Sequence, residues 1–310
     1  MDFDMLGLSP RLVAALAAQG ITKPTPIQTQ AIPHAMNGRD VMGLAQTGTG
    51  KTAAFGLPML DTIIKAGTKP APKTARALIL APTRELVKQI CDHLRAFTED
   101  SHLKITMVVG GVAIGPQIKR LARGSDLLVA TPGRLIDHLD RGTVRLDETR
   151  FLVLDEADQM LDLGFIHALR RIAPLLPAER QTMLFSATMP KQMVELSAAY
   201  LTDPVRVEVS PPGKVADKIT QSLHFVGHPE KPEKLIGMLS DHASEMALVF
   251  TRTKHGADRL ARKVEGAGFE VAAIHGNRSQ GQRERAIKAF REGRIKVLVA
   301  TDVAARGIDI

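Results

Sequence analysis

Short apolar runs alternate with helix-like stretches along almost the whole chain, and this alternation restricts the possible fold more than any other feature. Expected strands such as residues 41–44, 126–130 and 151–154 show no in-out alternation of apolar and polar side chains. Strands of this kind are typical of a parallel sheet that helices cover on both faces. The pattern therefore predicts an α/β fold.

A cluster of prolines with a glycine between residues 204 and 213 interrupts the alternation. Segments of this composition are typical of domain boundaries. Beyond it the alternation starts again with an expected strand at residues 223–226 and continues to another at residues 296–300. We expect a first domain over residues 1–209, a linker over 210–217 and a second domain over 218–310.

The charge balance favours a polyanionic partner such as nucleic acid. The 310 residues carry a formal net charge of +8, and the smaller second part is the more basic, with 17 basic and 12 acidic side chains against 24 and 21 before it. The chain has no Trp, a single Tyr and ten Phe, which leaves few aromatic side chains on which bases could stack. We therefore expect backbone contacts to the nucleic acid, with little sequence preference.

Several classes of protein are excluded. A single cysteine, Cys91, can form neither an intramolecular disulfide nor a cysteine-rich zinc site, which favours a reducing compartment. No apolar run approaches the roughly 18 residues that a membrane helix needs. The first ten residues do not resemble a signal peptide. These features predict a cytoplasmic protein without a membrane segment.

A glycine-rich segment with the sequence AQTGTGKT, residues 45–52, follows the expected strand 41–44 and begins a helix. Backbone N–H groups of such a loop surround a phosphate, the lysine reaches the β- and γ-phosphates, and the final hydroxyl can bind Mg²⁺. Ala45 stands where the general pattern has its first glycine. The residues expected to bind nucleotide here are Gln46, Thr47, Gly48, Thr49, Gly50, Lys51 and Thr52.

Three carboxylates follow the expected strand 151–154 directly, in Asp155-Glu156-Ala157-Asp158. A carboxylate at the end of a buried strand can hold Mg²⁺, here Asp155 together with Thr52, and a neighbouring glutamate can polarise water. Alone, such a run is more often an exposed helix N-terminus. Together with the phosphate loop it indicates nucleoside triphosphate hydrolysis, with Lys51, Asp155 and Glu156 as catalytic residues.

From Phe3 to Ile310 the motifs stand in the order found in DEAD-box ATP-dependent RNA helicases, and the chain resembles the bacterial members of that family. The resemblance implies two RecA-like parallel-sheet domains in tandem, of which the second is expected to be incomplete. It also implies that ATP, Mg²⁺ and RNA bind across the cleft between them and that short RNA duplexes are locally unwound. Residues 20–28 resemble the family's Q motif, in which Gln28 would read adenine. By the same resemblance, Phe3 as the upstream aromatic and Ile21, which stands where the family often has an aromatic side chain, are expected to contact the nucleotide.

Further segments of the first domain resemble the family's RNA-binding motifs, and each follows an expected strand. In an open parallel sheet this edge is where ligands bind. Alone, each segment would be an ordinary turn between strand and helix. The residues to which the resemblance assigns the coupling between ATP hydrolysis and RNA separation are Asp158, Ser186 and Thr188. It assigns RNA binding to Pro82, Thr83, Arg84, Gly110, Gly111, Thr131, Pro132, Gly133 and Arg134.

The second domain contains the family's remaining motifs beside a strongly basic stretch. Residues 251–296 carry 12 basic and five acidic side chains. By resemblance, Gly307 and Asp309 contact the nucleotide. RNA binding is expected from Arg252, His275, Gly276, Arg283, Thr301 and Asp302.

The sequence ends at Ile310, before the arginine-rich segment with which the family's motifs end. We expect a fragment of an ordinary helicase. One alternative is a nucleotide-dependent RNA clamp without efficient hydrolysis, and another is a DNA-directed ATPase with the same core. No feature of the sequence specifies a protein partner.

Overall fold

The structure is a computed structural model that describes residues 2–99, 101–209 and 219–302. The chain divides into two compact units, Met1–Lys214 and Val215–Ile310. The expected linker at residues 210–217 lies outside the described residues, and the proposed domain bounds therefore stay a prediction. Each unit is described by itself.

The first unit is built on a seven-stranded sheet in which every pair of neighbouring strands is parallel, so the expected α/β fold is confirmed. The order across the sheet is β3-β4-β2-β5-β6-β1-β7. The strands are β1 (Val41–Leu44), β2 (Ala75–Leu80), β3 (Ile105–Val108), β4 (Ser125–Ala130), β5 (Phe151–Leu154), β6 (Gln181–Ser186) and β7 (Val205–Glu208).

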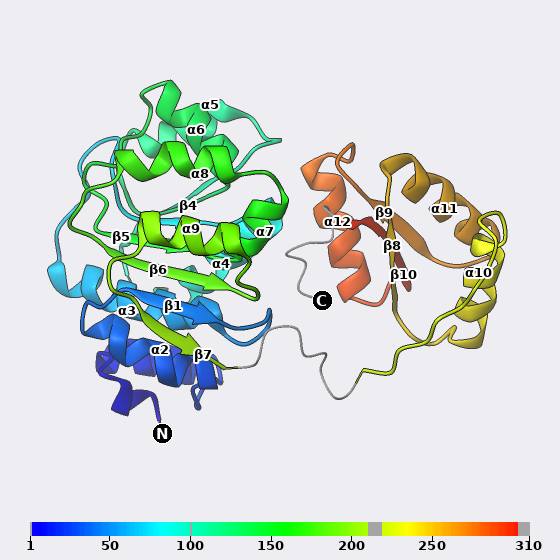
Figure 1. The fold of residues 1–310 in the computed structure, drawn as a ribbon, viewed down its shortest axis with the longest axis horizontal. Coiled ribbons are helices and arrows are strands. Elements are labelled where there is room, and N and C mark those ends of the chain that lie inside the picture. Colours follow the sequence, from blue (N-terminus) through cyan, green and yellow to red (C-terminus); the bar gives the residue numbers. More distant parts are fainter. Residues whose placement is uncertain (1, 100, 210–218, 303–310) are drawn as a thin grey trace. The chain divides into compact units, whose positions relative to one another are not determined.

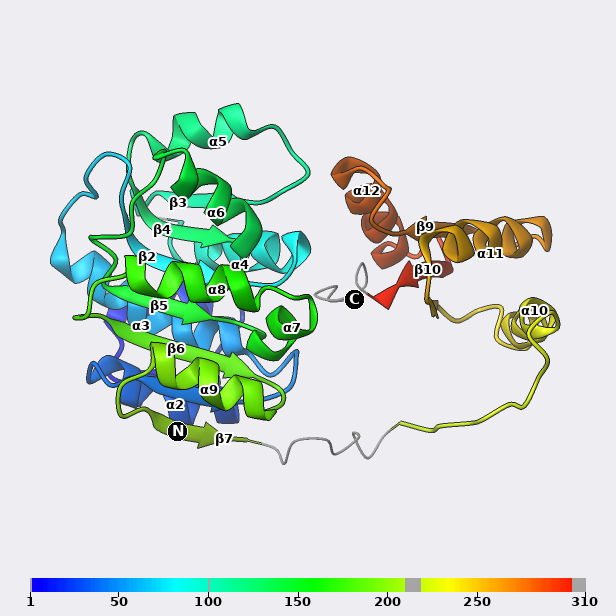
Figure 2. The ribbon, with the colours of Figure 1, turned by 45° about the horizontal axis from the view of Figure 1, so that its top comes forward.

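Helices cover both faces of this sheet (Figures 1 and 2). All six residues of β4 are buried, as expected for a strand covered on both sides. Two separate apolar cores result, one on each face. One core includes η1 (Phe3–Leu6), α1 (Pro10–Ala18), α2 (Pro26–Met36), α3 (Lys51–Ala66) and α4 (Arg84–Phe97); the other includes α5 (Ile114–Leu121), α6 (Pro132–Asp140), α7 (Ala157–Asp162), α8 (Ile166–Ile172), η2 (Ala173–Leu175) and α9 (Lys191–Tyr200).

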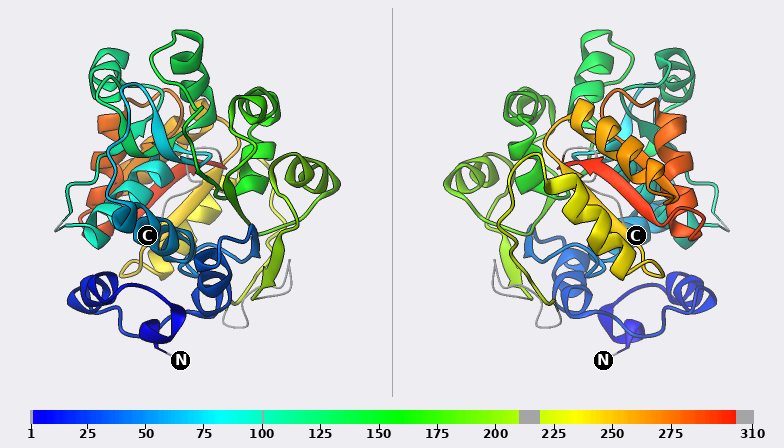
Figure 3. Two further views of the ribbon diagram at one scale, coloured as in Figure 1. Left: turned by 90° about the vertical axis from the view of Figure 1, so that its left-hand side faces the viewer. Right: turned by 90° about the vertical axis from the view of Figure 1, so that its right-hand side faces the viewer.

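The second unit contains a smaller parallel sheet in the order β8-β10-β9. Apolar residues of α10 and α11 pack on one face, and α12 packs on the other, as the right-hand view of Figure 3 shows in yellow, orange and red. Its elements are α10 (Lys231–Asp241), β8 (Ala247–Thr251), α11 (Lys254–Gly266), β9 (Val271–Ile274), α12 (Gln280–Arg291) and β10 (Val297–Thr301).

The prediction of a strand at residues 223–226 is wrong. The segment forms no strand, and the side chains of Leu223 and Phe225 are 78% and 92% exposed. An extended segment becomes a strand only where another strand pairs with its N–H and C=O groups, and none of the described strands does so.

None of the described helices is long and apolar enough to cross a membrane.

Candidate functional site

The carboxyl ends of the strands collect the expected functional segments at one edge of the first sheet. Those expected to bind RNA follow β3, β4 and β2, which are neighbours in the sheet. Those expected to handle nucleotide follow β5, β6 and β1, which are also neighbours. The sheet edge thus has two adjoining halves, in the position where open α/β sheets bind ligands.

The phosphate loop connects β1 to the N-terminus of the 16-residue helix α3. Gly50 caps that helix with φ of 89°, a left-handed conformation that favours glycine, and a Cβ there would overlap the Gln28 amide. Gln46, Thr47 and Gly48 are exposed, while Thr49 donates from Oγ1 to the carbonyl oxygen of Gln46 at 2.7 Å. The loop therefore presents its backbone at a helix N-terminus, which suits an anion.

Lys51, the first residue of α3, lies close to Asp155, which directly follows β5. The side chain of Lys51 is 7% exposed, and Nζ lies 3.9 Å from Asp155 Oδ1 and donates to the carbonyl oxygen of Ala45 at 3.3 Å. Burial raises the pKa of Asp155, although the positive charge of Lys51 opposes the shift. A further cation beside this carboxylate would stabilise its ionised form.

Glu156 is held beside this pair in an uncommon backbone conformation. Its φ and ψ are 50° and 51°, and its side chain is 2% exposed. A non-glycine residue in the left-handed region is strained and is found preferentially at functional sites. The Glu156 N–H donates to Asp155 Oδ1 at 3.0 Å, which orients the carboxylate of Asp155.

The donor set fits Mg²⁺ bound with a nucleotide. Thr52 is half-buried in the first turn of α3, and Asp155 provides a buried carboxylate. Among the described residues no three His, Cys, Asp or Glu side chains form a group that could hold a metal. Few protein ligands are expected for Mg²⁺, which is usually held by one or two side chains together with phosphate oxygens and water.

The expected adenine-reading residue lies against the phosphate loop. Gln28 is 4% exposed, its Nε2 donates to the carbonyl oxygen of Gly50 at 3.0 Å, and its Oε1 accepts from the Thr25 N–H at 2.9 Å. Ile21 is half-buried. Phe3 is 2% exposed and belongs to the apolar core beneath α2, so its ring has little open surface for a base.

Asp158 is joined to the segment after β6. Its Oδ2 accepts hydrogen bonds from both the N–H and the Oγ1 of Thr188, at 2.9 and 2.8 Å. Ser186 is buried and instead donates from Oγ to the carbonyl oxygen of Thr188 at 2.7 Å. Of the two hydroxyl side chains, Thr188 thus contacts Asp158, whereas Ser186 holds the loop that carries Thr188.

The expected RNA segments of the first unit divide into buried and exposed residues. Thr83 accepts from the Leu86 N–H at 3.2 Å and so caps α4. Pro82, Thr131 and Pro132 are buried, whereas Gly110, Arg84 and Arg134 are half-buried and Gly111 and Gly133 are exposed. The buried members can set the direction of α4 and α6, and only the others have surface for RNA.

These exposed segments converge on the two glycines after β3. A Cβ at Gly111 would overlap the guanidinium of Arg84, and Arg134 donates from an Nη atom to the carbonyl oxygen of Val112 at 3.1 Å. A residue that the sequence interpretation missed, Gln117, binds the same loop from the protein interior. No local signal marked it, because a glutamine in a short amphipathic helix is ordinary.

In the second unit most of the expected RNA residues lie at the carboxyl ends of β8, β9 and β10, and Arg283 lies in α12. Arg252, Gly276 and Asp302 are exposed, while Thr301, Arg283 and His275 are buried. His275 Nε2 lies 2.9 Å from Asp258 Oδ1, which also accepts from Arg278 at 2.8 Å. The sequence interpretation missed Asp258. Gly307 and Asp309 lie outside the described residues.

A phosphate-type loop and a lysine that faces a strand-end Asp-Glu pair define a class: α/β proteins that bind nucleoside triphosphates. The family model for DEAD/DEAH box helicases matches residues 25–196, and that for the helicase conserved C-terminal domain matches residues 230–310. The chain belongs to the DEAD-box helicase family.

Similar proteins agree with this assignment. DEAD-box ATP-dependent RNA helicase 9 of rice is 47% identical over all of this chain and 49% of its own length, and CshA of Bacillus subtilis is 41% identical over 100% and 62%. The chain thus spans only about half to three-fifths of these relatives. A solved structure of S. cerevisiae Dbp5 bound to RNA and ADP BeF3 has a TM-score of 0.87 at 31% identity, covering 99% of this chain and 78% of that one. The two parallel-sheet units are RecA-like domains in tandem, as expected.

Proposed function

We propose that this chain binds ATP with Mg²⁺, binds RNA through its backbone, and uses ATP hydrolysis to separate short RNA duplexes. The observation that carries the proposal is the division of one sheet edge into a nucleotide half, β5-β6-β1, and an adjoining RNA half, β3-β4-β2. Family membership supports the same function.

The nucleotide half has a residue for each task in phosphoryl transfer. The loop N–H groups and Lys51 bind the β- and γ-phosphates, and Gln28 at the edge of the loop reads adenine. Thr52 and Asp155 would hold Mg²⁺, which would supply positive charge next to the transferred phosphate. Glu156 orients the attacking water and accepts its proton. Catalysis here consists of positioning and charge stabilisation.

Coupling of ATP hydrolysis to RNA separation is assigned to the contact of Asp158 with Thr188, which lies within the nucleotide half of the sheet edge. The contact joins the residues after β5 to those after β6. A change at the γ-phosphate, next to Asp155 and Glu156, can thereby shift the loop after β6. For this contact to couple the two sites, it must have a different arrangement in each nucleotide state.

RNA is proposed to lie over the exposed backbone of Gly110 and Gly111 and the guanidinium groups of Arg84 and Arg134. Backbone amides and arginines contact phosphate and sugar and carry little sequence information. In the second unit Arg252, Gly276 and Asp302 provide the exposed surface.

Strand displacement from a short duplex tests the proposal. The chain is mixed with a labelled RNA duplex of about ten base pairs and with a DNA duplex of the same sequence. We expect ATP-dependent release of the RNA strand only. Lys51→Ala should abolish release, whereas Lys69→Ala, an exposed lysine after α3, should not.

Each alternative predicts a different result. A DNA-directed ATPase would release the DNA strand equally well. A nucleotide-dependent clamp would bind RNA more tightly with ATP yet release no strand. Either result would contradict the proposed unwinding.

A further inference from the structure

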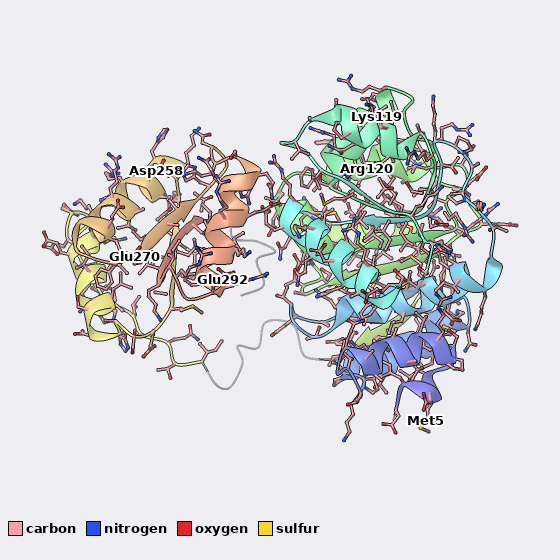
Figure 4. All side chains as sticks on the ribbon, turned by 180° about the vertical axis from the view of Figure 1, so that it is seen from behind. Met5, Lys119, Arg120, Asp258, Glu270 and Glu292 are labelled. Carbon is pink, nitrogen blue, oxygen red and sulfur yellow. The ribbon has the colours of Figure 1, made fainter. Side chains whose placement is uncertain are left out.

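Gln117 is a buried polar side chain in a helix whose outer face is basic. It lies on α5 and is 4% exposed, whereas Lys119 and Arg120 on the same helix, both labelled in Figure 4, are exposed. A buried amide is unfavourable unless its oxygen and nitrogen find hydrogen-bond partners. The partners of Gln117 therefore indicate why the residue is placed there.

The Gln117 amide binds the chain on both sides of the two glycines: both of its ends bind Val109, before them, and its nitrogen also reaches Ala113, after them. Its Oε1 accepts from the Val109 N–H at 3.1 Å, and its Nε2 donates to the Val109 carbonyl oxygen at 3.1 Å. Nε2 also lies 3.4 Å from the carbonyl oxygen of Ala113. One side chain thus fixes the residue before Gly110 and the first residue after Val112.

The same loop is contacted by side chains from the other two RNA segments. The Arg84 guanidinium lies over Gly111, which has φ of 72°, and Arg134 binds the Val112 carbonyl oxygen. The loop is therefore held by the buried Gln117 and by two arginines that have surface for RNA. Because the arginines touch the loop, displacement of the loop would also displace them.

We propose that Gln117 is a positioning residue for RNA binding, which holds residues 110–112 in the conformation that RNA contacts. The proposal rests on the proposed function, since it assumes that this loop binds RNA. A loop held in its bound conformation before RNA arrives loses less conformational freedom on binding. Loss of the amide should therefore weaken RNA binding without altering the nucleotide half of the sheet edge.

Gln117→Met removes the amide and keeps nearly the same volume. We expect the affinity for single-stranded RNA to fall roughly tenfold, as for loss of buried hydrogen bonds, with unchanged affinity for ATP measured without RNA. The matched control is Gln181→Met. Gln181 is the first residue of β6 and therefore lies at the amino end of that strand, away from the edge with the functional segments. Gln181 also donates to two backbone carbonyl oxygens, those of Ala35 and Arg39, both at 2.8 Å.

Gln117→Glu keeps the acceptor for the Val109 N–H and removes the donor. The new oxygen would face the Val109 carbonyl oxygen, a repulsive contact in a buried position, so the RNA affinity should fall at least as far as in Gln117→Met. Hydrogen exchange provides a readout that does not depend on RNA: the Val109 amide should exchange faster in Gln117→Met, with no change in β2. Each variant, including Gln181→Met, is measured at the same number of degrees below its own melting temperature, so that differences in stability do not affect the comparison.

The outcomes separate this proposal from the proposed function. If the wild type binds RNA and both Gln117 variants bind it equally well, or if Val109 exchange is unchanged, the positioning role is wrong. A wild type that does not bind RNA contradicts the proposed function itself. Equal weakening in Gln117→Met and Gln181→Met would show a general loss of stability and would also overturn the positioning role.

Discussion

The side-chain amide of Gln28 donates a hydrogen bond to the backbone carbonyl oxygen of Gly50 at 3.0 Å. Gly50 directly precedes Lys51, so the proposed adenine-reading residue and the proposed phosphate-binding loop are in direct contact. An adenine that forms hydrogen bonds with the Gln28 amide would compete with the hydrogen bond from that amide to Gly50 in the phosphate-binding loop. Base recognition and phosphate binding are therefore expected to depend on each other.

Substitution of Gln28 tests this dependence. Gln28→Glu replaces the donor with a second oxygen that faces the Gly50 carbonyl, so the contact becomes repulsive. We expect ATP affinity to fall at least roughly tenfold and the preference for ATP over GTP to decrease, both measured with fluorescent nucleotides. Gln30→Glu adds the same charge to the exposed face of α2 and should leave both unchanged. Equal effects of the two variants would contradict the expectation.

The two glycines after β3 should differ in their tolerance of a side chain. A Cβ at Gly110 would lie at an ordinary 3.7 Å from Arg84, whereas one at Gly111 would overlap the guanidinium and require a left-handed alanine. We expect Gly111→Ala to weaken RNA binding severalfold, with Gly110→Ala close to the wild type. Fluorescence anisotropy measures the RNA affinity of both variants. Weaker RNA binding by Gly110→Ala than by Gly111→Ala would contradict the described conformation of the loop.

The strand-end positions of the functional residues could be predicted from the sequence. Asp155 follows a strand at residues 151–154, where β5 is observed, because a continuous apolar run marks a buried strand clearly. The grouping of β5 with β6 and β1 could not be predicted, because strand order is set by pairing between residues far apart in the chain. Gln117 was missed for a similar reason: only the folded helix shows that its side chain turns inward to Val109.

Other expectations depended on neighbours that the sequence does not reveal. Phe3 is expected from the resemblance to contact the nucleotide, yet its ring is buried among apolar residues of η1, α1 and α2. The apolar run at residues 223–226 resembles a strand, but local composition cannot supply a strand to pair with it.

Asp40 should contribute much more to stability than the ion pair beside it. Its buried carboxylate accepts from the N–H groups of Thr182 at 2.6 Å and Thr202 at 2.7 Å, which join β6 and the segment before β7. Asp40→Asn should lower the free energy of unfolding by about 2–4 kcal/mol in urea titrations, because an amide N–H would face a backbone donor. Asp203→Asn, at the exposed pair with Arg39, should lower it by at most about 1 kcal/mol. Similar values for both would contradict this.

His138 should make the first unit less stable in acid. Its ring is fully buried with Nδ1 2.8 Å from Thr143 Oγ1, and burial, reinforced by the charge of Arg134, lowers the pKa of His138 from 6.5. Between that lowered pKa and 6.5 the unfolded state binds the extra proton, so stability falls as pH decreases through this window. The slope from this one group is at most about 1.4 kcal/mol per pH unit.

Urea titrations between pH 8 and pH 5 measure this dependence. His138→Gln should lose the acid-side decrease that the wild type shows, whereas His93→Gln, at an exposed position on α4, should retain it. An unchanged pH profile in His138→Gln would show that another group is responsible.

The central claim is that Glu156, held beside Lys51 and Asp155, carries out RNA-stimulated ATP hydrolysis. The most direct test is the rate of phosphate release with and without single-stranded RNA, for the wild type, Glu156→Gln and the exposed control Glu195→Gln. We predict that RNA increases the rate in the wild type and the control, and that Glu156→Gln binds ATP with wild-type affinity but shows no increase. RNA stimulation that persists at the wild-type level in Glu156→Gln would contradict the account.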